Sequence, residues 1–119
     1  MIGAGLTGLI ALLHLFILVL EMFLWETRLA RRAFGTSEEF AINTKVMAAN
    51  QGLYNGFLAA GLIWALYLGL PGEGQAIAIF FLLCVLLAGV YGGLTAASRI
   101  LYVQALPAGL ALLAIFAGL

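Results

Sequence analysis

Four long apolar stretches occupy nearly the whole chain and constrain its fold more than any other feature. They run from about residue 2 to 25, 46 to 69, 76 to 97 and 100 to 119. Crossing the hydrocarbon core of a bilayer takes about 20 apolar residues at ~1.5 Å each. None of the stretches alternates like a barrel strand, and an open sheet would leave backbone groups unpaired in lipid. We therefore expect an all-α fold, a four-helix transmembrane bundle that forms a single integral membrane domain over residues 1–119.

The composition agrees with a membrane protein and excludes several function classes. Apolar residues make up 66% of the chain and charged residues only 8%, where soluble domains carry roughly a quarter. The net charge of zero leaves no basic surface for nucleic acid. The single Cys84 excludes an internal disulfide, and one His without a second ligand nearby is a poor metal site. No nucleotide or haem motif is present, so we expect neither a metal nor a cofactor.

The basic residues predict the topology because all five lie in two connections. Between the first and second stretches are Arg28, Arg31, Arg32 and Lys45, and between the third and fourth is Arg99. These connections are on one side of the membrane by parity, and the positive-inside rule makes that side cytoplasmic. Both termini and the turn from Leu70 to Gln75 are then outside.

The connection from Glu26 to Lys45 is the only sizeable extramembrane piece. Its first half, ETRLARRAF, is expected to continue the first helix as far as Gly35, which can adopt the left-handed conformation that ends a helix. Thr36 and Glu39 have the spacing of a capping box, which would start the next helix before it enters lipid. The expected result is a cytoplasmic helical hairpin between the first two membrane helices.

Polar residues recur along one stripe of the first helix. Thr7, His14, Glu21 and Arg28 are seven residues apart, which at 100° per residue places all four on one face, and Trp25 lies on the same stripe. Because the other faces are apolar, this stripe is expected to face protein or water.

The other three helices place polar groups at a similar depth in the cytoplasmic half of the membrane. These are Asn50, Gln51, Tyr54 and Asn55 on the second helix, Tyr91 and Thr95 on the third, and Gln104 on the fourth. Side chains of this kind can simply hydrogen-bond helices to one another, at about 0.6–2 kcal/mol each. An ionisable residue in the membrane is instead a candidate functional group, which favours a functional role for Glu21 and His14.

Two pairs of glycines have the spacing that lets membrane helices approach closely. They are Gly52 with Gly56, and Gly89 with Gly93. Such pairs serve contacts within a chain or between chains. A homo-oligomer formed through either pair of faces is therefore one possible assembly, beside the lipid bilayer itself as partner.

Four segments carry a resemblance to a known family. They are HLFILVLEMFLW (14–25), NQGLYNGFLAAG (50–61), GVYGGLTAA (89–97) and VQALPA (103–108). Over nearly the whole chain the sequence resembles the small bacterial proteins grouped as domain-of-unknown-function family 1304. The resemblance implies four helices and a multi-pass location in the bacterial inner membrane, and it brings no established activity.

A looser likeness is to the membrane-associated eicosanoid and glutathione metabolism proteins, which are four-helix proteins of similar length. They bind glutathione in the cytoplasmic half, with arginine, asparagine and glutamate on the second helix. Lys45 and Asn50 match part of that pattern, but Tyr54 or Asn55 stands where the glutamate is expected, and no arginine lies within the second helix.

The sequence thus leads to three hypotheses for function. The first is a protein that binds or transports a small polar ligand or a proton through a cytoplasm-facing cavity, with Glu21 as the protonatable group. The cavity would be lined by Glu21, His14, Trp25, Asn50, Gln51, Tyr54, Asn55, Tyr91, Thr95 and Gln104. The second is a membrane enzyme acting on a lipophilic substrate, with Glu21 or His14 as acid or base and Tyr91 as donor. The third is a structural partner of another membrane protein.

Overall fold

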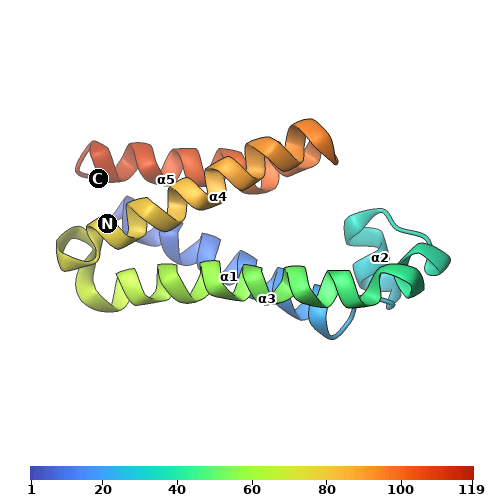
Figure 1. Cartoon of the computed structure of the whole chain (residues 1–119). Helices are drawn as coiled ribbons and strands as arrows, with labels where there is room; N and C mark the ends of the chain where they lie inside the picture. The colour runs from blue at the N-terminus through green and yellow to red at the C-terminus, as the bar shows by residue number, and fades with distance from the viewer. The chain divides into compact units, whose positions relative to one another are not determined.

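The computed structural model describes all residues, 1–119, and every regular element in it is helical (Figure 1). The elements are α1 (Ile2–Met22), α2 (Arg28–Phe34), α3 (Glu38–Leu68), η1 (Gly69–Glu73), α4 (Gln75–Thr95), η2 (Leu101–Ala105) and α5 (Leu106–Phe116). The all-α prediction is confirmed.

Three segments are long and apolar enough to cross a membrane. They are Ile2–Met22, Lys45–Glu73 and Gln75–Thr95. The fourth expected span corresponds to a shorter apolar helix, Leu101–Phe116. Length and composition therefore support three membrane-spanning helices directly.

The chain divides into two compact units. The first, unit 1, consists of Met1–Leu12 and Leu58–Leu119, and the second, unit 2, is Leu13–Phe57. Helices α1 and α3 each contribute one end to each unit.

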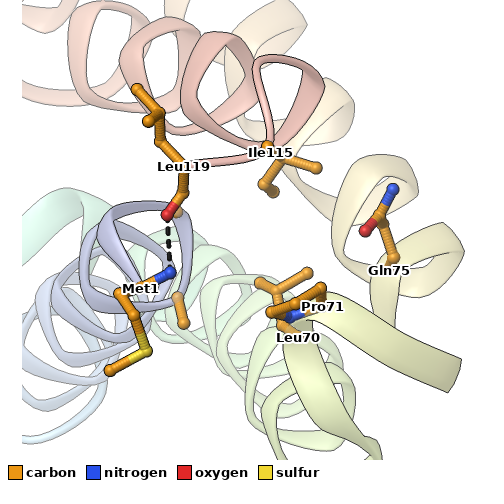
Figure 2. Close-up of a pocket in the computed structure, with 9 residues that line it drawn as sticks. Met1, Leu70, Pro71, Gln75, Ile115 and Leu119 are labelled. Carbon is orange, nitrogen blue, oxygen red and sulfur yellow. Dashed lines mark hydrogen bonds between the residues drawn. The ribbon is translucent and has the colours of Figure 1, made fainter.

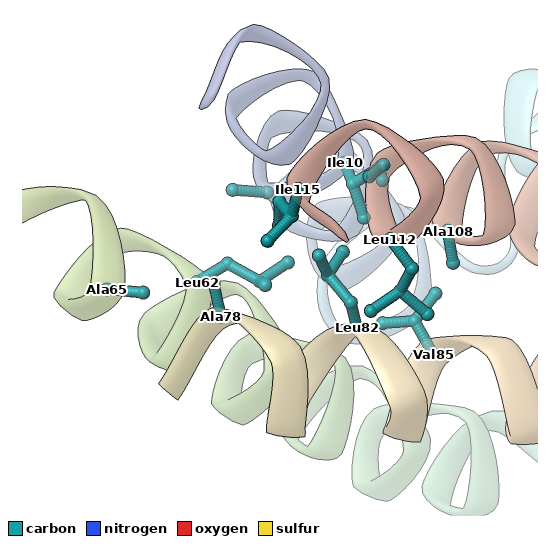
Figure 3. Packing of buried hydrophobic residues seen from close by; sticks show 11 residues of the cluster. Ile10, Leu62, Ala65, Ala78, Leu82, Val85, Ala108, Leu112 and Ile115 are labelled. Carbon is teal, nitrogen blue, oxygen red and sulfur yellow. The ribbon is translucent and has the colours of Figure 1, made fainter. Parts of the chain in front are cut away.

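Unit 1 has one hydrophobic core, to which segments of four helices contribute (Figure 3). Leu82 and Val85 of α4 lie against Leu112 of α5, as Figure 3 shows. The core consists of Ile10 and Ala11 of α1, Leu62 and Ala65 of α3, Ala78, Leu82 and Val85 of α4, and Ala108, Ala111, Leu112 and Ile115 of α5. Several members are alanines, which lets the helix backbones approach closely.

The Gly89 and Gly93 pair lies at the contact between α4 and η2 within unit 1. A Cβ at Gly89 would be 2.6 Å from the backbone nitrogen of Ala105, and one at Gly93 would clash with Leu101 Cγ. These glycines therefore pack against the same chain. Whether two chains associate stays a prediction, but this face is already covered.

The π-helical turn η2 precedes Pro107 for a clear reason. Proline has no backbone N–H, and its ring clashes with the carbonyl four residues earlier. The helix widens there, so that the N–H of Leu106 donates to the carbonyl oxygen of Leu101, five residues back.

The ends of the chain and the turn between α3 and α4 meet at one end of unit 1 (Figure 2). The Met1 amino group donates to the Leu119 carbonyl oxygen at 2.5 Å. A small cavity of about 60 Å³ there is lined by residues that include Met1, Pro71, Gln75 and Leu119. The backbone is non-helical from Leu70 to Gly72, which confirms the predicted turn.

In unit 2 the first helix does not continue through ETRLARRAF, so that prediction is wrong. Helix α1 ends at Met22, and α2 begins at Arg28 after a turn. The Thr27 side chain explains the break, because its hydroxyl donates to the Leu24 carbonyl oxygen at 2.6 Å and accepts from the Ala30 N–H at 3.3 Å. Thr27 thus caps a new helix.

The connection between α2 and α3 confirms one predicted cap and corrects another. Gly35 ends α2 in the left-handed conformation, with φ 68° and ψ 37°, as expected. The predicted capping box does not form, because the Ser37 hydroxyl, not that of Thr36, accepts from the Phe40 N–H at 3.1 Å. The buried Thr36 hydroxyl has no hydrogen-bond partner. Helix α3 still begins ahead of its candidate span, as predicted.

Candidate functional site

A hydrogen bond between Glu21 and Asn55 is the centre of the candidate site. Asn55 Nδ2, on α3, donates to Glu21 Oε1, on α1, at 2.7 Å. The Glu21 residue is only 5% exposed. Both residues belong to unit 2 and to candidate membrane spans. The structure therefore places a carboxyl group inside an apolar segment with a neutral amide as its partner.

Two glycines on α3 bring the helices close enough for this bond. A Cβ at Gly52 would lie 2.6 Å from Met22 Cγ and 3.1 Å from Glu21 Cβ, and one at Gly56 would lie 2.6 Å from Leu18 Cδ1. Residues 52, 55 and 56 share one face of a helix, since they are three and four apart. The Gly52 and Gly56 pair thus serves a contact within the chain.

The polar stripe on α1 is confirmed as far as Glu21. Thr7, His14 and Glu21 are all buried, and the Thr7 hydroxyl donates to the Gly3 carbonyl oxygen at 2.7 Å. Arg28 does not extend the stripe, because α1 ends at Met22 and α2 starts in a new register. Arg28 is exposed.

The other polar residues of α3 do not join the pair through their side chains. Asn50 is exposed and its Nδ2 donates to the Val46 carbonyl oxygen of its own helix at 2.9 Å. The side chains of Gln51 and Tyr54 are exposed. Only the backbone carbonyl oxygen of Gln51 contacts the pair, accepting from Asn55 Nδ2 at 3.1 Å. A 100° step per residue explains the difference: the face that turns Asn55 toward α1 turns Asn50 away.

Trp25 lies in the second hydrophobic cluster of the chain. Its indole Nε1 donates to Thr44 Oγ1 at 3.1 Å, and its ring packs on Phe34 with centroids 5.0 Å apart. Ala41 and Ala48 complete the cluster. Trp25 therefore joins α2 to α3. Thr44, its partner, was not among the predicted site residues, and its position on α3, just before the candidate span that begins at Lys45, gave no signal of this contact.

The remaining predicted residues belong to unit 1, outside the unit that contains Glu21. Tyr91 is 72% exposed, and Thr95 is exposed with its hydroxyl donating to the Tyr91 carbonyl oxygen at 2.7 Å. Gln104 is half-buried. Thr95, like Asn50, thus satisfies its donor within its own helix, as Ser, Thr and Asn side chains commonly do.

Lysine and arginine side chains do not neutralise Glu21. The ion pair of unit 2 joins Lys45 Nζ to Glu26 Oε1 at 3.2 Å, and Arg31 Nε donates to the Glu26 carbonyl oxygen at the same distance. No lysine or arginine lies within ion-pair distance of Glu21. The carboxyl group is instead hydrogen-bonded to the neutral amide of Asn55.

Comparison with known proteins places the chain in a family. The family model described as "Protein of unknown function (DUF1304)" matches residues 8–116. The chain belongs to the DUF1304 family. It is also 32% identical over 112 residues to the "Uncharacterized protein YpaA" of Lactococcus lactis subsp. lactis (strain IL1403), across 92% of this chain and 90% of that protein. No solved structure matches the chain significantly. The DUF1304 match covers Glu21, Asn55 and both glycine pairs.

The two pockets described in this DUF1304 protein lie in unit 1. One is the small cavity in Figure 2, and the other is an open apolar groove of about 420 Å³ on η2 and α5, beside Gly109 and Leu110. None of the predicted site residues lines either of them. The cytoplasm-facing polar cavity thus stays a prediction.

Proposed function

We propose that this chain is a multi-pass protein of the bacterial inner membrane that binds a proton or a small polar ligand at Glu21 and carries it across the bilayer. The observation that supports this most strongly is the Glu21 carboxyl group, buried in a candidate membrane span and hydrogen-bonded to Asn55. Placing an ionisable group there costs about 2.5–3.5 kcal/mol on insertion scales, so such residues are usually functional.

The proposed topology is a bundle of four membrane helices with both termini outside and the hairpin around α2 in the cytoplasm. Support comes from the core of unit 1, where α5 packs along α4. Residues 101–116 extend about 24 Å at ~1.5 Å per residue, somewhat less than the ~30 Å hydrocarbon core. An even number of crossings also agrees with the contact between Met1 and Leu119.

The test is proton flux into liposomes that contain the purified protein and an internal pH-sensitive dye. We expect wild-type protein to admit protons when a gradient is applied, and Glu21→Gln to abolish the flux. Glu73→Gln is the matched control, because Glu73 is an exposed carboxylate in the turn between α3 and α4. Equal flux through the wild type and Glu21→Gln would contradict a role for this carboxyl group.

A purely structural role is the second candidate, and one observation favours it. The bond from Asn55 to Glu21 joins α1 and α3 where Gly52 and Gly56 bring them together, which is also how an interhelical lock would be built. In that case Glu21→Gln and Glu21→Leu would change only the melting temperature, and neither the wild type nor a variant would carry protons.

A further inference from the structure

The hydrogen bonds of Asn55 indicate what kind of ligand the site accepts. Asn55 Nδ2 donates to Glu21 Oε1 at 2.7 Å and to the backbone carbonyl oxygen of Gln51 at 3.1 Å. A primary amide has two N–H donors and one acceptor oxygen. Both donors of Asn55 are therefore used within the protein, and Oδ1 is the atom left to contact a ligand.

The charge state of Glu21 and the residues near it determine what else the pair offers a ligand. An ionised carboxylate only accepts hydrogen bonds, and no lysine or arginine lies within ion-pair distance of Glu21. Beside the pair, a Cβ at position 52 would meet the aliphatic parts of Glu21 and Met22 and the Leu18 backbone carbonyl oxygen, and one at position 56 would meet Leu18 Cδ1. The pair of Glu21 and Asn55 thus presents acceptor oxygens in apolar surroundings.

A site that offers only hydrogen-bond acceptors binds cations in preference to anions. An anion such as a carboxylate or phosphate would meet oxygens without donors and a like charge, which is unfavourable in a low dielectric. A cation with N–H groups would instead form charge-assisted hydrogen bonds to Glu21 and to Asn55 Oδ1. The 5% exposure of Glu21 restricts the ligand to a small one.

We propose that the Glu21 and Asn55 pair binds a small cation that carries N–H donors, of the ammonium or primary-amine class. This inference rests on the proposed function and names the ligand class of the same site.

The experiment measures the melting temperature of the purified protein in detergent against rising methylammonium chloride at neutral and alkaline pH. Tetramethylammonium chloride is the control for a cation without N–H groups, and sodium acetate is the control for an anion, all at one ionic strength.

We expect saturable stabilisation of the wild-type protein by methylammonium alone. Glu21→Gln should abolish it, and Asn55→Ala should weaken the apparent affinity about tenfold, the equivalent of one hydrogen bond. Asn43→Ala, at an exposed position of α3 outside the site, should leave it unchanged.

Four results would overturn the inference: no saturable effect of methylammonium, equal effects of the three salts, saturable stabilisation by acetate, or an undiminished response in Glu21→Gln. Proton flux into liposomes separates this failure from failure of the proposed function. If proton flux depends on Glu21 but methylammonium does not bind, the proposed function is retained and the ammonium-class ligand is rejected. If neither proton flux nor methylammonium binding is observed, the proposed function and the ligand class are both rejected.

Discussion

Individual polar residues in this chain fall into two groups that a sequence does not separate. The first group donates to the backbone of its own helix, as Thr7 does to Gly3, Asn50 to Val46 and Thr95 to Tyr91. The second makes contacts between helices, as Asn55 does with Glu21. Only the contacts of the second group show which faces of two helices pack against each other.

Replacing Asn55 by Leu tests this distinction at a single residue. The change removes the partner of a buried carboxyl group, and leaving such a group unsatisfied costs about 1–3 kcal/mol. The matched control is Asn50→Leu, where the lost bond is to the same helix and the side chain is exposed. Thermal unfolding in detergent should show a clearly lower melting temperature for Asn55→Leu only. Equal losses in both variants would mean that the bond to Glu21 is energetically unimportant.

The caps of α3 give a second prediction for single residues. Ser37→Ala should destabilise the protein by about 1 kcal/mol, because Ser37 accepts the Phe40 N–H. Thr36→Val replaces a buried hydroxyl that has no partner by a methyl group, so stability should stay the same or rise. Unfolding of the two variants side by side measures the difference. The reverse order would restore Thr36 as the cap.

At the scale of helices, close approach depends on small residues at the contacts. Gly52 and Gly56 lie against Leu18, Glu21 and Met22 of α1, whereas a Cβ at Gly109 would meet nothing within 4 Å. The glycine spacing in the sequence indicates a packing face but not its partner, since the same pattern serves contacts within and between chains.

Gly52→Leu should therefore force α1 and α3 apart. Overpacking of this kind costs about 1–3 kcal/mol, and the displacement of Glu21 should also lower proton flux. Gly109→Leu is the control and should be tolerated, because the space beside it is open. Melting temperature and flux are measured for both variants. Tolerance of Gly52→Leu in both measurements would argue against the close contact of α1 with α3.

For the whole molecule, the sequence predicts the helical fold, the three long apolar helices that could cross a membrane and the turn from Leu70 to Gln75, because long apolar runs admit few alternatives. The break after Met22 escapes prediction, since EMFLWETR contains neither Gly nor Pro and the break depends on the cap at Thr27. Of the candidate site, the stripe through His14 and Glu21 follows from periodicity. Asn55, and not its neighbour Tyr54, is the hydrogen-bond partner of Glu21 because of how α3 is rotated against α1, which the sequence alone does not give.

Labelling of intact cells tests the proposed topology of the whole molecule. In a Cys84→Ala background, a cysteine at position 73 should react with a membrane-impermeant thiol reagent, whereas one at position 31 should react only after lysis. The reason is the concentration of all five basic residues in two connections. The opposite labelling pattern would invert the topology, and the side from which a ligand reaches Glu21 would change with it.

The central claim is that Glu21 exchanges protons with water from within the membrane. Infrared spectroscopy of the carboxyl C=O band in the protein reconstituted in lipid measures this most directly. We predict a band that changes with pH in the wild type and in Glu73→Gln, is shifted in Asn55→Ala by loss of the hydrogen bond to Glu21, and is absent in Glu21→Gln. Identical pH-dependent spectra for the wild type and Glu21→Gln would contradict the account.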